Sequence, residues 1–329
     1  MDGQDLAEVP NLREIILGLL LQIPEGKITT YKDIALALGD EAAARAVGTV
    51  MANNDEPERY PCWKVIHTNG EVGNYSGEGG AEAKINRIRS AGITVEAGKV
   101  KNFDRVRFRE FEIDPPLPEM RAVQGRVRQM VSRRPLAGLP EKTAGVDVSY
   151  GPGGVVAAYV EMEKGEEEPV TRVTVHRDTV KVPYIPGYLA FRELPILLDL
   201  FKTVGEASLA GVIFVDGNGV LHPRRAGLAS HLGVVVDHPT VGIAKKLLCG
   251  DVDNSGLEPG EKASVVKDGD VLGVSLKTFS RANPIYVSVG HKISLRQGWS
   301  LAGSFSKYKL PEPLRRAHKL AKAEATSSD

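Results

Sequence analysis

A short proline-rich segment divides this chain into two stretches with different sequence patterns. The segment Ile113-Asp114-Pro115-Pro116-Leu117-Pro118 holds three prolines in four positions, and proline stops helix continuation and stiffens the backbone. Before it, apolar residues are spaced mostly as in helices. After it, a helix over roughly 119–133 is followed by strands that alternate with helices. We therefore expect a first domain over 1–112, a linker over 113–118 and a second domain over 119–329.

The composition is that of a folded protein without a membrane or secretory segment. Hydrophobic residues make up 42% and charged residues 26% of the 329 residues, and there is no run of ~18 apolar residues to span a bilayer. The apolar run 15–21 follows acidic residues, whereas a signal peptide starts with basic ones. Two cysteines exclude a disulfide framework and a cysteine-rich zinc cluster. We expect a reducing, cytoplasmic location.

The charge is uneven along the chain although it sums to zero. Residues 1–114 hold 14 basic and 19 acidic residues, and residues 115–329 hold 28 and 23, so the two parts carry net charges near −5 and +5. Nucleic-acid binding needs only a local basic face. The overall balance argues against a histone-like protein that binds through net charge alone.

Two short helices in the first half are spaced as in a helix-turn-helix. Apolar spacing predicts a helix over 12–21. Thr30 with Asp33 three residues later indicates the start of a helix over 31–38, which Gly39 ends, and a further helix follows over 42–51. The second helix of such a pair enters a DNA groove. Because most helix pairs only pack together, this pattern alone leaves both interpretations open.

The residues that follow carry a more specific pattern. The motifs are Arg45-Ala46-Val47-Gly48, Asn54, Pro61-Cys62-Trp63-Lys64-Val65-Ile66 and Val72-Gly73-Asn74-Tyr75-Ser76-Gly77. Over roughly residues 10–100 the chain resembles the DNA-binding domain of alkylguanine-DNA alkyltransferases and of their alkyltransferase-like relatives. The active-site motif of that family is Pro-Cys-His-Arg-Val, of which Pro61, Cys62 and Val65 are present.

This resemblance implies a suicide reaction in which an alkylated guanine is flipped out of the duplex and a cysteine takes the alkyl group from oxygen six. Cys62 matches the nucleophile, which must react as a thiolate. Arg45 matches the arginine that fills the gap left by the flipped base, since lost stacking has to be replaced. The other matches are Tyr31, which helps to turn the target phosphate, Asn54, which braces the active-site turn, and Tyr75, in the loop that lines the base pocket.

Three positions depart from the pattern of this family. Trp63 replaces the histidine that relays the cysteine proton, Lys64 replaces an arginine, and Ala91 stands near the place of the glutamate that orients the histidine. In one interpretation Cys62 is a working nucleophile that Lys64 or a helix N-terminus activates. In the other the domain is a non-catalytic sensor of alkylated bases, and Cys62 only packs.

Acidic residues of the second half stand inside or at the end of apolar segments. Asp147 lies in the strand expected over 144–150, and Asp216 ends the strand expected over 211–216. Glu193 lies at the edge of the apolar face of a helix over 187–201. A buried carboxylate is costly unless it is paired or binds a metal, and hard cations prefer oxygen ligands. Together the three acids indicate a magnesium site, while each alone is explained equally by a strand-end cap or an ion pair.

Ordered motifs around these acids resemble endonuclease V, a nuclease that nicks DNA beside deaminated bases. They are Pro183 to Tyr188, Phe191-Arg192-Glu193, Val215 to Gly219, His222-Pro223-Arg224-Arg225, Pro239 to Lys245, Gly273-Val274-Ser275 and Val289-Gly290-His291. The resemblance covers about residues 118–310. It implies a ribonuclease H-like domain, a mixed sheet of about five strands flanked by helices. With a winged helix-turn-helix-type N-terminal domain, the chain is α/β overall. We expect the small, polar tail after Leu320 to be disordered.

The same resemblance implies roles for residues of a metal-dependent nuclease. Asp147, Glu193 and Asp216 match the acids that bind Mg²⁺, for which Mn²⁺ can substitute. His222 and Lys245 match a catalytic histidine and lysine. His291 lies in a further matched motif, and a lone histidine there is explained equally as a site residue or as a core residue.

Further residues match those that grip the nucleic acid. Pro183, Tyr184, Ile185 and Pro186 match a wedge that separates the strands, with Tyr184 stacking in the vacated space. Arg224 and Arg225 are expected to contact phosphates.

The two resemblances together predict a bifunctional DNA repair protein. The first domain transfers an alkyl group from guanine to Cys62, and the second nicks DNA at the second phosphodiester 3′ to hypoxanthine or another deaminated base. In one alternative the first domain only senses the lesion and directs the nuclease, and in another the nuclease acts on inosine-containing RNA. The expected partner is damaged DNA, double- or single-stranded, with no membrane and no required protein partner.

Overall fold

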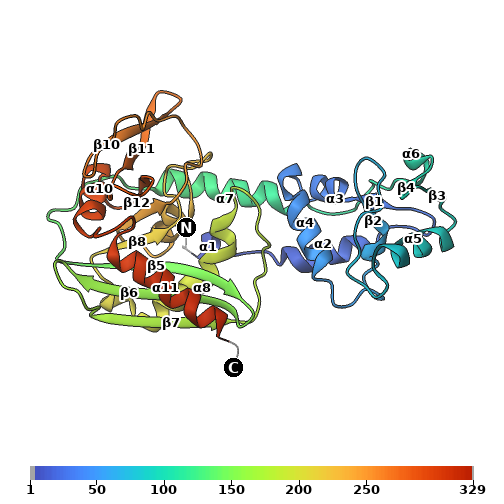
Figure 1. The fold of residues 1–329 in the computed structure, drawn as a ribbon, viewed down its shortest axis with the longest axis horizontal. Helices are drawn as coiled ribbons and strands as arrows, with labels where there is room; N and C mark the ends of the chain where they lie inside the picture. Colours follow the sequence, from blue (N-terminus) through green and yellow to red (C-terminus); the bar gives the residue numbers. More distant parts are fainter. Residues whose placement is uncertain (1–3, 328–329) are drawn as a thin grey trace. The chain divides into compact units, whose positions relative to one another are not determined.

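The computed structural model describes residues 4–327 and divides the chain into two compact units (Figure 1). The N-terminal unit holds Val9–Met120 together with Lys181–Pro186. The sheet unit holds residues 4–8, 121–180 and 187–327. These units differ from the expected segments in three places: 4–8 belongs to the sheet unit, and both 181–186 and 113–120, which includes the expected linker, belong to the N-terminal unit. Among the described residues, no helix is both long and apolar enough to cross a membrane.

Short helices and two small sheets make up the N-terminal unit. Its helices are α2 (Leu12–Leu20), α3 (Tyr31–Ala37), α4 (Ala44–Ala52), α5 (Gly80–Ser90) and α6 (Phe103–Val106). Strand β1 (Thr29–Thr30) pairs in parallel with β2 (Val65–Ile66), and β3 (Val95–Glu96) pairs antiparallel with β4 (Lys99–Val100). Apolar side chains from β2, β3, β4 and α5 form one of its cores.

Helices α3 and α4 confirm the pair that the sequence predicts. The Thr30 hydroxyl accepts a hydrogen bond from the Asp33 N–H (3.0 Å) and so caps α3. A 3-10 turn, η1 (Glu41–Ala43), precedes α4, which is why α4 begins two residues later than expected. Gly39 ends α3 with a φ of +94°, a conformation that favours glycine.

The proline-rich segment packs against the turn after α3. The Leu117 N–H donates to the Leu38 carbonyl (3.1 Å), and a Cβ atom on Gly39 would lie 2.4 Å from Cδ of Pro118. Helix α7 (Pro116–Met130) begins inside this segment, three residues before the expected start. Prolines are tolerated there because the N–H groups of a first helical turn have no partner within the helix.

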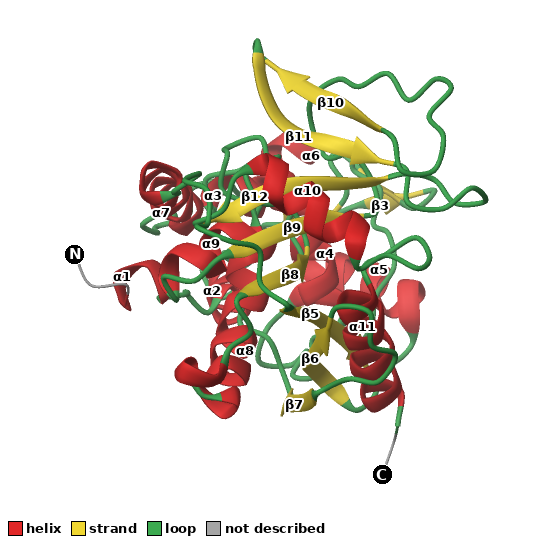
Figure 2. Cartoon of the chain, turned by 90° about the vertical axis from the view of Figure 1, so that its left-hand side faces the viewer, coloured by secondary structure: helices red, strands yellow, loops and turns green. Residues whose placement is uncertain are grey.

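An eight-stranded mixed sheet forms the centre of the sheet unit (Figure 2). Its strands are β5 (Lys142–Gly151), β6 (Gly154–Glu163), β7 (Thr171–Arg177), β8 (Val212–Asp216), β9 (Thr240–Ala244), β10 (Lys262–Lys267), β11 (Asp270–Leu276) and β12 (Ile285–His291). Their order is β10-β11-β12-β9-β8-β5-β6-β7, with parallel pairing at β5–β8 and β8–β9. The last five strands of this order form the expected ribonuclease H-like sheet, and the first three extend it antiparallel beyond β9.

Helices cover both faces of this sheet. Helices α8 (Leu189–Val204) and α9 (Leu228–Val235) share one core with β5, β6 and β8. Helices α10 (Leu295–Ser304) and α11 (Glu312–Thr326) pack on the other face. The side chains of β6 alternate accordingly: Ala157 and Tyr159 lie in the α8 core, and Ala158 and Val160 face α11. The short α1 (Gln4–Ala7) contacts α8 and α9.

Helix α11 shows that the expectation of a disordered tail after Leu320 is wrong. The small side chains of Ala317, Ala321 and Ala325 recur every fourth residue and are all buried, so the helix lies close to the sheet. At Gly145 on β5, a Cβ atom would lie 2.2 Å from the backbone nitrogen of Leu314. The absence of a side chain there lets α11 cross directly over β5, as Figure 1 shows.

Candidate active sites

Three residues from three elements of the sheet unit bring their side chains to one point. Asp147 comes from β5, Asp216 ends β8, and His318 comes from α11; one ligand atom of each lies within 4.8 Å of the other two. The His318 Nδ1 and Asp147 Oδ2 are 2.6 Å apart. Asp147 stands two residues after Gly145 on the strand, and His318 stands four residues after Leu314 on the helix. The close crossing at Gly145 therefore carries His318 to Asp147.

Glu193 adds a third carboxylate to this group. It is buried on α8, where it accepts a hydrogen bond from the Tyr150 hydroxyl (3.3 Å). Burial, together with the charges of Asp147 and Asp216, raises the pKa of Glu193 well above its usual range. Burial and Asp147 also raise the pKa of Asp216, which Lys245 and His318 partly offset. The three acids thus lie close enough to repel one another.

Lys245 follows β9 and approaches the same group. Its Nζ lies 2.5 Å from Oδ2 of Asp216. Burial makes the charged form of these carboxylates unfavourable, and a bound cation would compensate for this. Carboxylate oxygens with a histidine nitrogen beside them suit a divalent cation. Asp147, Asp216 and His318 could therefore hold a divalent cation, and the buried Glu193, the third acid expected to bind it, lies beside them.

His222 lies in the loop after β8. It is buried, and burial with the nearby Arg224 guanidinium lowers its pKa to about 4. The Arg224 guanidinium donates to the Gln124 side chain and the Gly187 carbonyl, and it lies over the Tyr188 ring. The imidazole ring of His222 is therefore neutral at pH 7. The Arg224 guanidinium already has hydrogen-bond partners within the protein.

Arg225 and His291 are also held by protein partners. Arg225 is buried with a φ of +59°, and its Nη2 lies 3.3 Å from the Lys267 carbonyl and 3.5 Å from Asp270. His291 is buried, with Nδ1 accepting from the Ser132 N–H (3.2 Å). These partners give both residues a structural explanation that does not require DNA.

The predicted wedge lies in a segment with alternating burial. Pro183 and Ile185 are buried, whereas Tyr184 is 55% exposed and Pro186 is exposed. Residues 181–186 belong to the N-terminal unit, where the Arg13 N–H donates to the Lys181 carbonyl (3.2 Å). The neighbouring residues Pro183 and Ile185 are buried, while the Tyr184 ring is exposed to solvent.

A second site lies in the N-terminal unit, where Cys62 borders a cavity of about 810 Å³. Cys62 begins the 3-10 turn η2 (Cys62–Lys64) and is 4% exposed. Tyr31 from α3, Arg45 from α4 and Tyr75 from the loop before α5 line the same cavity. The four residues to which the resemblance assigned roles in alkyl transfer thus line one cavity: Cys62, Tyr31, Arg45 and Tyr75.

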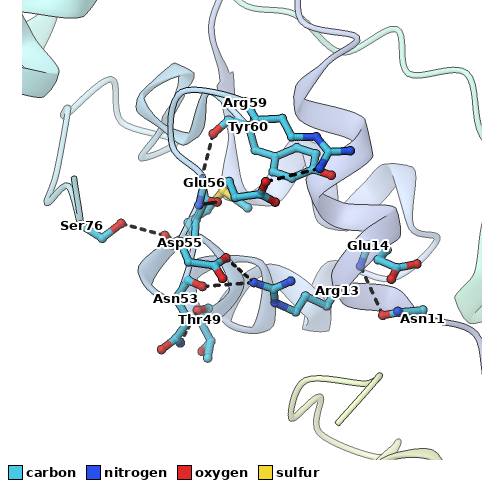
Figure 3. A network of polar contacts seen from close by, with 12 residues as sticks. Asn11, Arg13, Glu14, Thr49, Asn53, Asp55, Glu56, Arg59, Tyr60 and Ser76 are labelled. Carbon is cyan, nitrogen blue, oxygen red and sulfur yellow. Dashed lines mark hydrogen bonds and ion pairs between the residues drawn. The ribbon is translucent and has the colours of Figure 1, made fainter. Parts of the chain in front are cut away.

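Polar contacts hold the turn that presents Cys62, and Figure 3 shows the contacts around Tyr60, Asp55 and Arg13. The Asn54 amide donates to the Tyr60 carbonyl (2.9 Å), which also accepts from the Cys62 N–H (2.7 Å). Arg13 on α2 forms an ion pair with Asp55 (2.8 Å), next in sequence to Asn54. Asn54 therefore holds the Tyr60 carbonyl, two residues before Cys62.

Tyr75 carries an unsatisfied polar group at this cavity. Its hydroxyl oxygen is buried and has no hydrogen-bond partner among the described residues. The ring packs on Gly77, where a Cβ atom would approach Tyr75 to 2.4 Å. The hydrogen-bonding capacity of this hydroxyl is therefore not used by another described protein group.

The residues that depart from the family pattern lie away from the Cys62 cavity. Trp63 packs against the core of β2 and α5, and together with Lys64 and Ala91 it lines a separate cavity of about 430 Å³. The Lys64 ammonium donates to the Ile23 carbonyl (2.7 Å). The sequence had suggested Lys64 as the cation beside Cys62; the structure instead turns this side chain to the end of α2.

Two residues of these sites were missed by the sequence reasoning. One is His318, on α11, of which only the part after Leu320 was expected to be a disordered tail. The other is Lys84 on α5, whose side chain lines the Cys62 cavity and is 1% exposed. A lysine among small and apolar residues on a helix face was the available signal for Lys84.

Sequence models of two families match this chain. The endonuclease V family matches residues 125–319, which is more than half of the chain. The DNA-binding domain of 6-O-methylguanine DNA methyltransferase matches residues 11–93. The two matched ranges contain the two sites described above.

Similar proteins carry both activities or the second alone in their names. The bifunctional methyltransferase/endonuclease of Thermoplasma volcanium is 36% identical over 312 residues, covering 95% of this chain and 90% of that protein. The protein of the same name from Picrophilus torridus is 35% identical, covering 94% and 95%. Endonuclease V of Thermofilum pendens is 45% identical over 195 residues, covering 57% and 80%.

Solved structures resemble the sheet unit. The catalytic domain of human endonuclease V has a TM-score of 0.58 at 34% identity, covering 64% of this chain and 96% of that chain. Endonuclease V of Ciona intestinalis, solved with DNA containing an inosine followed by a ribo-adenosine, has a TM-score of 0.56 at 28% identity, covering 64% and 98%. This chain belongs to the bifunctional methyltransferase/endonuclease family and joins a methyltransferase-type DNA-binding domain to an endonuclease V domain.

Proposed function

We propose that the sheet unit is a Mg²⁺-dependent endonuclease that nicks DNA at the second phosphodiester 3′ to hypoxanthine and other deaminated bases. The observation that carries this proposal is the convergence of Asp147, Asp216 and His318, with Glu193 beside them. These residues would hold the ion, which when bound supplies the positive charge that phosphodiester cleavage requires. The similar Ciona protein was solved with inosine-containing DNA, which supports this substrate class.

Lys245 and His222 of this unit, and Tyr184 of the N-terminal unit, would act through charge and shape. Lys245, 2.5 Å from Asp216, would offset negative charge at the scissile phosphate. His222 would act from its neutral form, because its pKa is lowered to about 4. Tyr184 would stack where the lesion leaves the duplex, since its ring is exposed on an anchored segment.

The test is a nicking assay on a duplex with one hypoxanthine. In the full chain, Asp147→Asn or Asp216→Asn is expected to abolish Mg²⁺-dependent nicking while much of the DNA binding persists. Asp253→Asn, an exposed aspartate of the same unit, is the matched control. Full cleavage by Asp147→Asn or by Asp216→Asn would show that the metal site lies elsewhere. The same assay on a DNA substrate and on an RNA substrate, each with one inosine, shows which nucleic acid the nuclease cleaves.

We also propose that the N-terminal unit transfers an alkyl group from guanine oxygen six to Cys62. The supporting observation is that Cys62 borders a cavity of about 810 Å³ that Tyr31, Arg45 and Tyr75 also line. In the reaction the Cys62 thiolate forms a bond to the alkyl carbon, the carbon–oxygen bond breaks, and its electron pair stays on the guanine, which takes up one proton. Arg45 would replace the flipped base in the stack.

Transfer is tested by mass measurement after exposure to a duplex with O6-methylguanine. One methyl group is expected on the peptide that contains Cys62, and none on the peptide of the second free cysteine, Cys249. Cys62→Ala should abolish the modification, and Cys249→Ala should retain it. An unmodified Cys62 peptide, with tight binding of the same duplex, would instead favour the sensor interpretation.

A further inference from the structure

The usual proton relay is replaced at this site by apolar packing. Trp63 and Ala91 stand where the related enzymes carry the histidine and the glutamate, and both line a cavity other than that of Cys62. Lys64 donates to the Ile23 and Pro24 carbonyls (2.7 and 3.3 Å). None of the three therefore stabilises the Cys62 thiolate.

A buried lysine also lines the Cys62 cavity. Lys84 comes from the first half of α5, is 1% exposed, and donates from Nζ to the Asn74 carbonyl (3.1 Å). Asn74 precedes Tyr75 in the loop that lines the same cavity. Burying an ammonium group is costly without charge compensation, so its position in the cavity that Cys62 borders calls for an explanation.

Lys84 and Cys62 interact electrostatically. Burial lowers the pKa of Lys84 to about 8, and the charge of Cys62 acts in the opposite direction. The Lys84 ammonium and the Cys62 thiol line the same cavity, and a nearby positive charge favours a thiolate over a thiol. The lowered pKa of Lys84 still leaves it mostly charged at pH 7.

The other charged or titratable groups around the cavity do not provide this charge equally well. They are Tyr31, Lys32, Glu41, Arg45, His67 and Tyr75. Lys32 is paired with Glu41 (2.6 Å), and burial raises the pKa of both tyrosines, which are neutral at pH 7. Arg45 and His67 are exposed. Arg87, also on α5 and coupled to Cys62, is paired with Glu58.

We propose that Lys84 stabilises the Cys62 thiolate and so takes over the task of the missing histidine–glutamate relay. This inference rests on the proposed alkyl transfer and identifies Lys84 as its positioning residue. The thiol proton leaves to solvent, the thiolate displaces guanine from the alkyl carbon, and the guanine takes up a proton from solvent. Lys84 keeps its own proton throughout, so the step balances without a further reactant.

The decisive measurement is the pH dependence of Cys62 alkylation by iodoacetamide, in the full chain carrying Cys249→Ala. Lys84→Met is expected to move the midpoint of this dependence upward by about one pH unit and to slow alkylation at pH 7 about tenfold. Lys84→Arg, which restores a positive charge, is expected to return the midpoint toward the starting value. Lys27→Met is the matched control, because Lys27 also donates to a carbonyl (Arg105, 2.7 Å) but does not line the cavity.

Superimposed pH dependences for the starting protein and Lys84→Met would overturn the inference. A merely structural role of Lys84 would slow alkylation at every pH and leave the midpoint in place, which also overturns it. The alkyl-transfer assay is read separately. If no variant accepts a methyl group from DNA but the midpoint shifts, the proposed transferase function fails while the effect of Lys84 on Cys62 stands.

A reciprocal measurement covers the case in which Lys84→Met does not fold. The Lys84 ammonium can be titrated by NMR in protein with isotope-labelled lysine, in which the packing of Lys84 is unchanged. Cys62→Ser removes the thiolate, so the Lys84 midpoint is expected to fall further below about 8. An unmoved Lys84 midpoint would show that the two groups do not interact.

Discussion

At the scale of single residues, the negative charge of the clustered carboxylates in the sheet unit is only partly balanced by positively charged side chains. Glu193 and Asp216 have raised pKa values because both are buried near other carboxylates, and Lys245 and His318 offset part of the charge at Asp216. A divalent cation would relieve this repulsion. His318 is the informative residue to remove, because it both orients Asp147 and offers a ligand atom.

His318→Ala is expected to reduce the nicking rate at limiting Mg²⁺ by roughly 10–100-fold, since a lost ligand or orienting partner weakens the metal site by about that factor. Nicking of the hypoxanthine duplex is measured against Mg²⁺ concentration. His176→Ala is the matched control, because His176 is half-exposed on β7 and lies 3.9 Å from Glu324. Equal rates for His318→Ala and the unchanged protein at every Mg²⁺ concentration would remove His318 from the site.

The sequence predicts the acids of this site but not their partners. Asp147 and Asp216 interrupt apolar strands, so the local pattern marks them as unusual. His318 lies 102 residues after Asp216, on a helix rich in charge and alanine, and reaches Asp147 only because Gly145 admits α11. Lys84 likewise joins Cys62 only through the packing of α5. Contacts of this kind depend on tertiary structure and leave little trace in the local pattern.

At the scale of elements, one buried ion pair fixes the helix that presents Tyr31. Asp33, in the first turn of α3, accepts two hydrogen bonds from Arg107 (2.7 and 2.8 Å) and one from the Thr30 hydroxyl (2.7 Å). Burial alone would raise the pKa of Asp33, but the bonds from Arg107 and Thr30 prevail and hold it below its usual value. The pair therefore anchors the start of α3, where Tyr31 enters the Cys62 cavity.

Asp33→Asn is expected to lower the free energy of unfolding of the N-terminal unit by roughly 3 kcal/mol at pH 7, because it leaves Arg107 without its buried partner. An acid whose pKa is lowered on folding contributes stability above its unfolded pKa, near 3.8, and loses it as pH falls through the folded pKa. The difference between variant and parent should thus shrink below about pH 4.

Denaturant unfolding at a series of pH values checks this sign. Asp55→Asn is the control, because Asp55 is also paired with an arginine but its side chain is 77% exposed. A difference between Asp33→Asn and its parent that grows on acidification would contradict the argument.

At the scale of the whole molecule, the start of the chain belongs with its second half. Leu6 on α1 is buried in the sheet unit, and its carbonyl lies 2.7 Å from Nε2 of His231 on α9. Burial lowers the pKa of His231 to about 4, so the ring is neutral at pH 7 and donates to this carbonyl. Phe191 packs edge-on against the same ring, with centroids 5.1 Å apart.

This association was not visible in the sequence. The two partners are 225 positions apart, and a four-residue helix has too little periodicity to show which surface it covers. The proline-rich segment, in contrast, suggested that everything before it forms one body. A fragment that starts at residue 118 retains the whole sheet but lacks α1, so we expect it to fold and nick with lower stability than the full chain.

Leu6→Ala in the full chain isolates this contribution. A buried leucine that becomes alanine costs about 2–3 kcal/mol, which for a unit of this size lowers its Tm by roughly 4–12 °C. Calorimetry should show this loss in the transition whose midpoint rises with Mg²⁺, because that transition reports the unit with the metal cluster. Leu21→Ala, at a leucine that is 59% exposed on the N-terminal unit, is the control. If Leu6→Ala leaves the Mg²⁺-sensitive transition in place, or lowers the other one instead, α1 does not stabilise the sheet unit, and the fragment from residue 118 should then match the full chain in thermal stability.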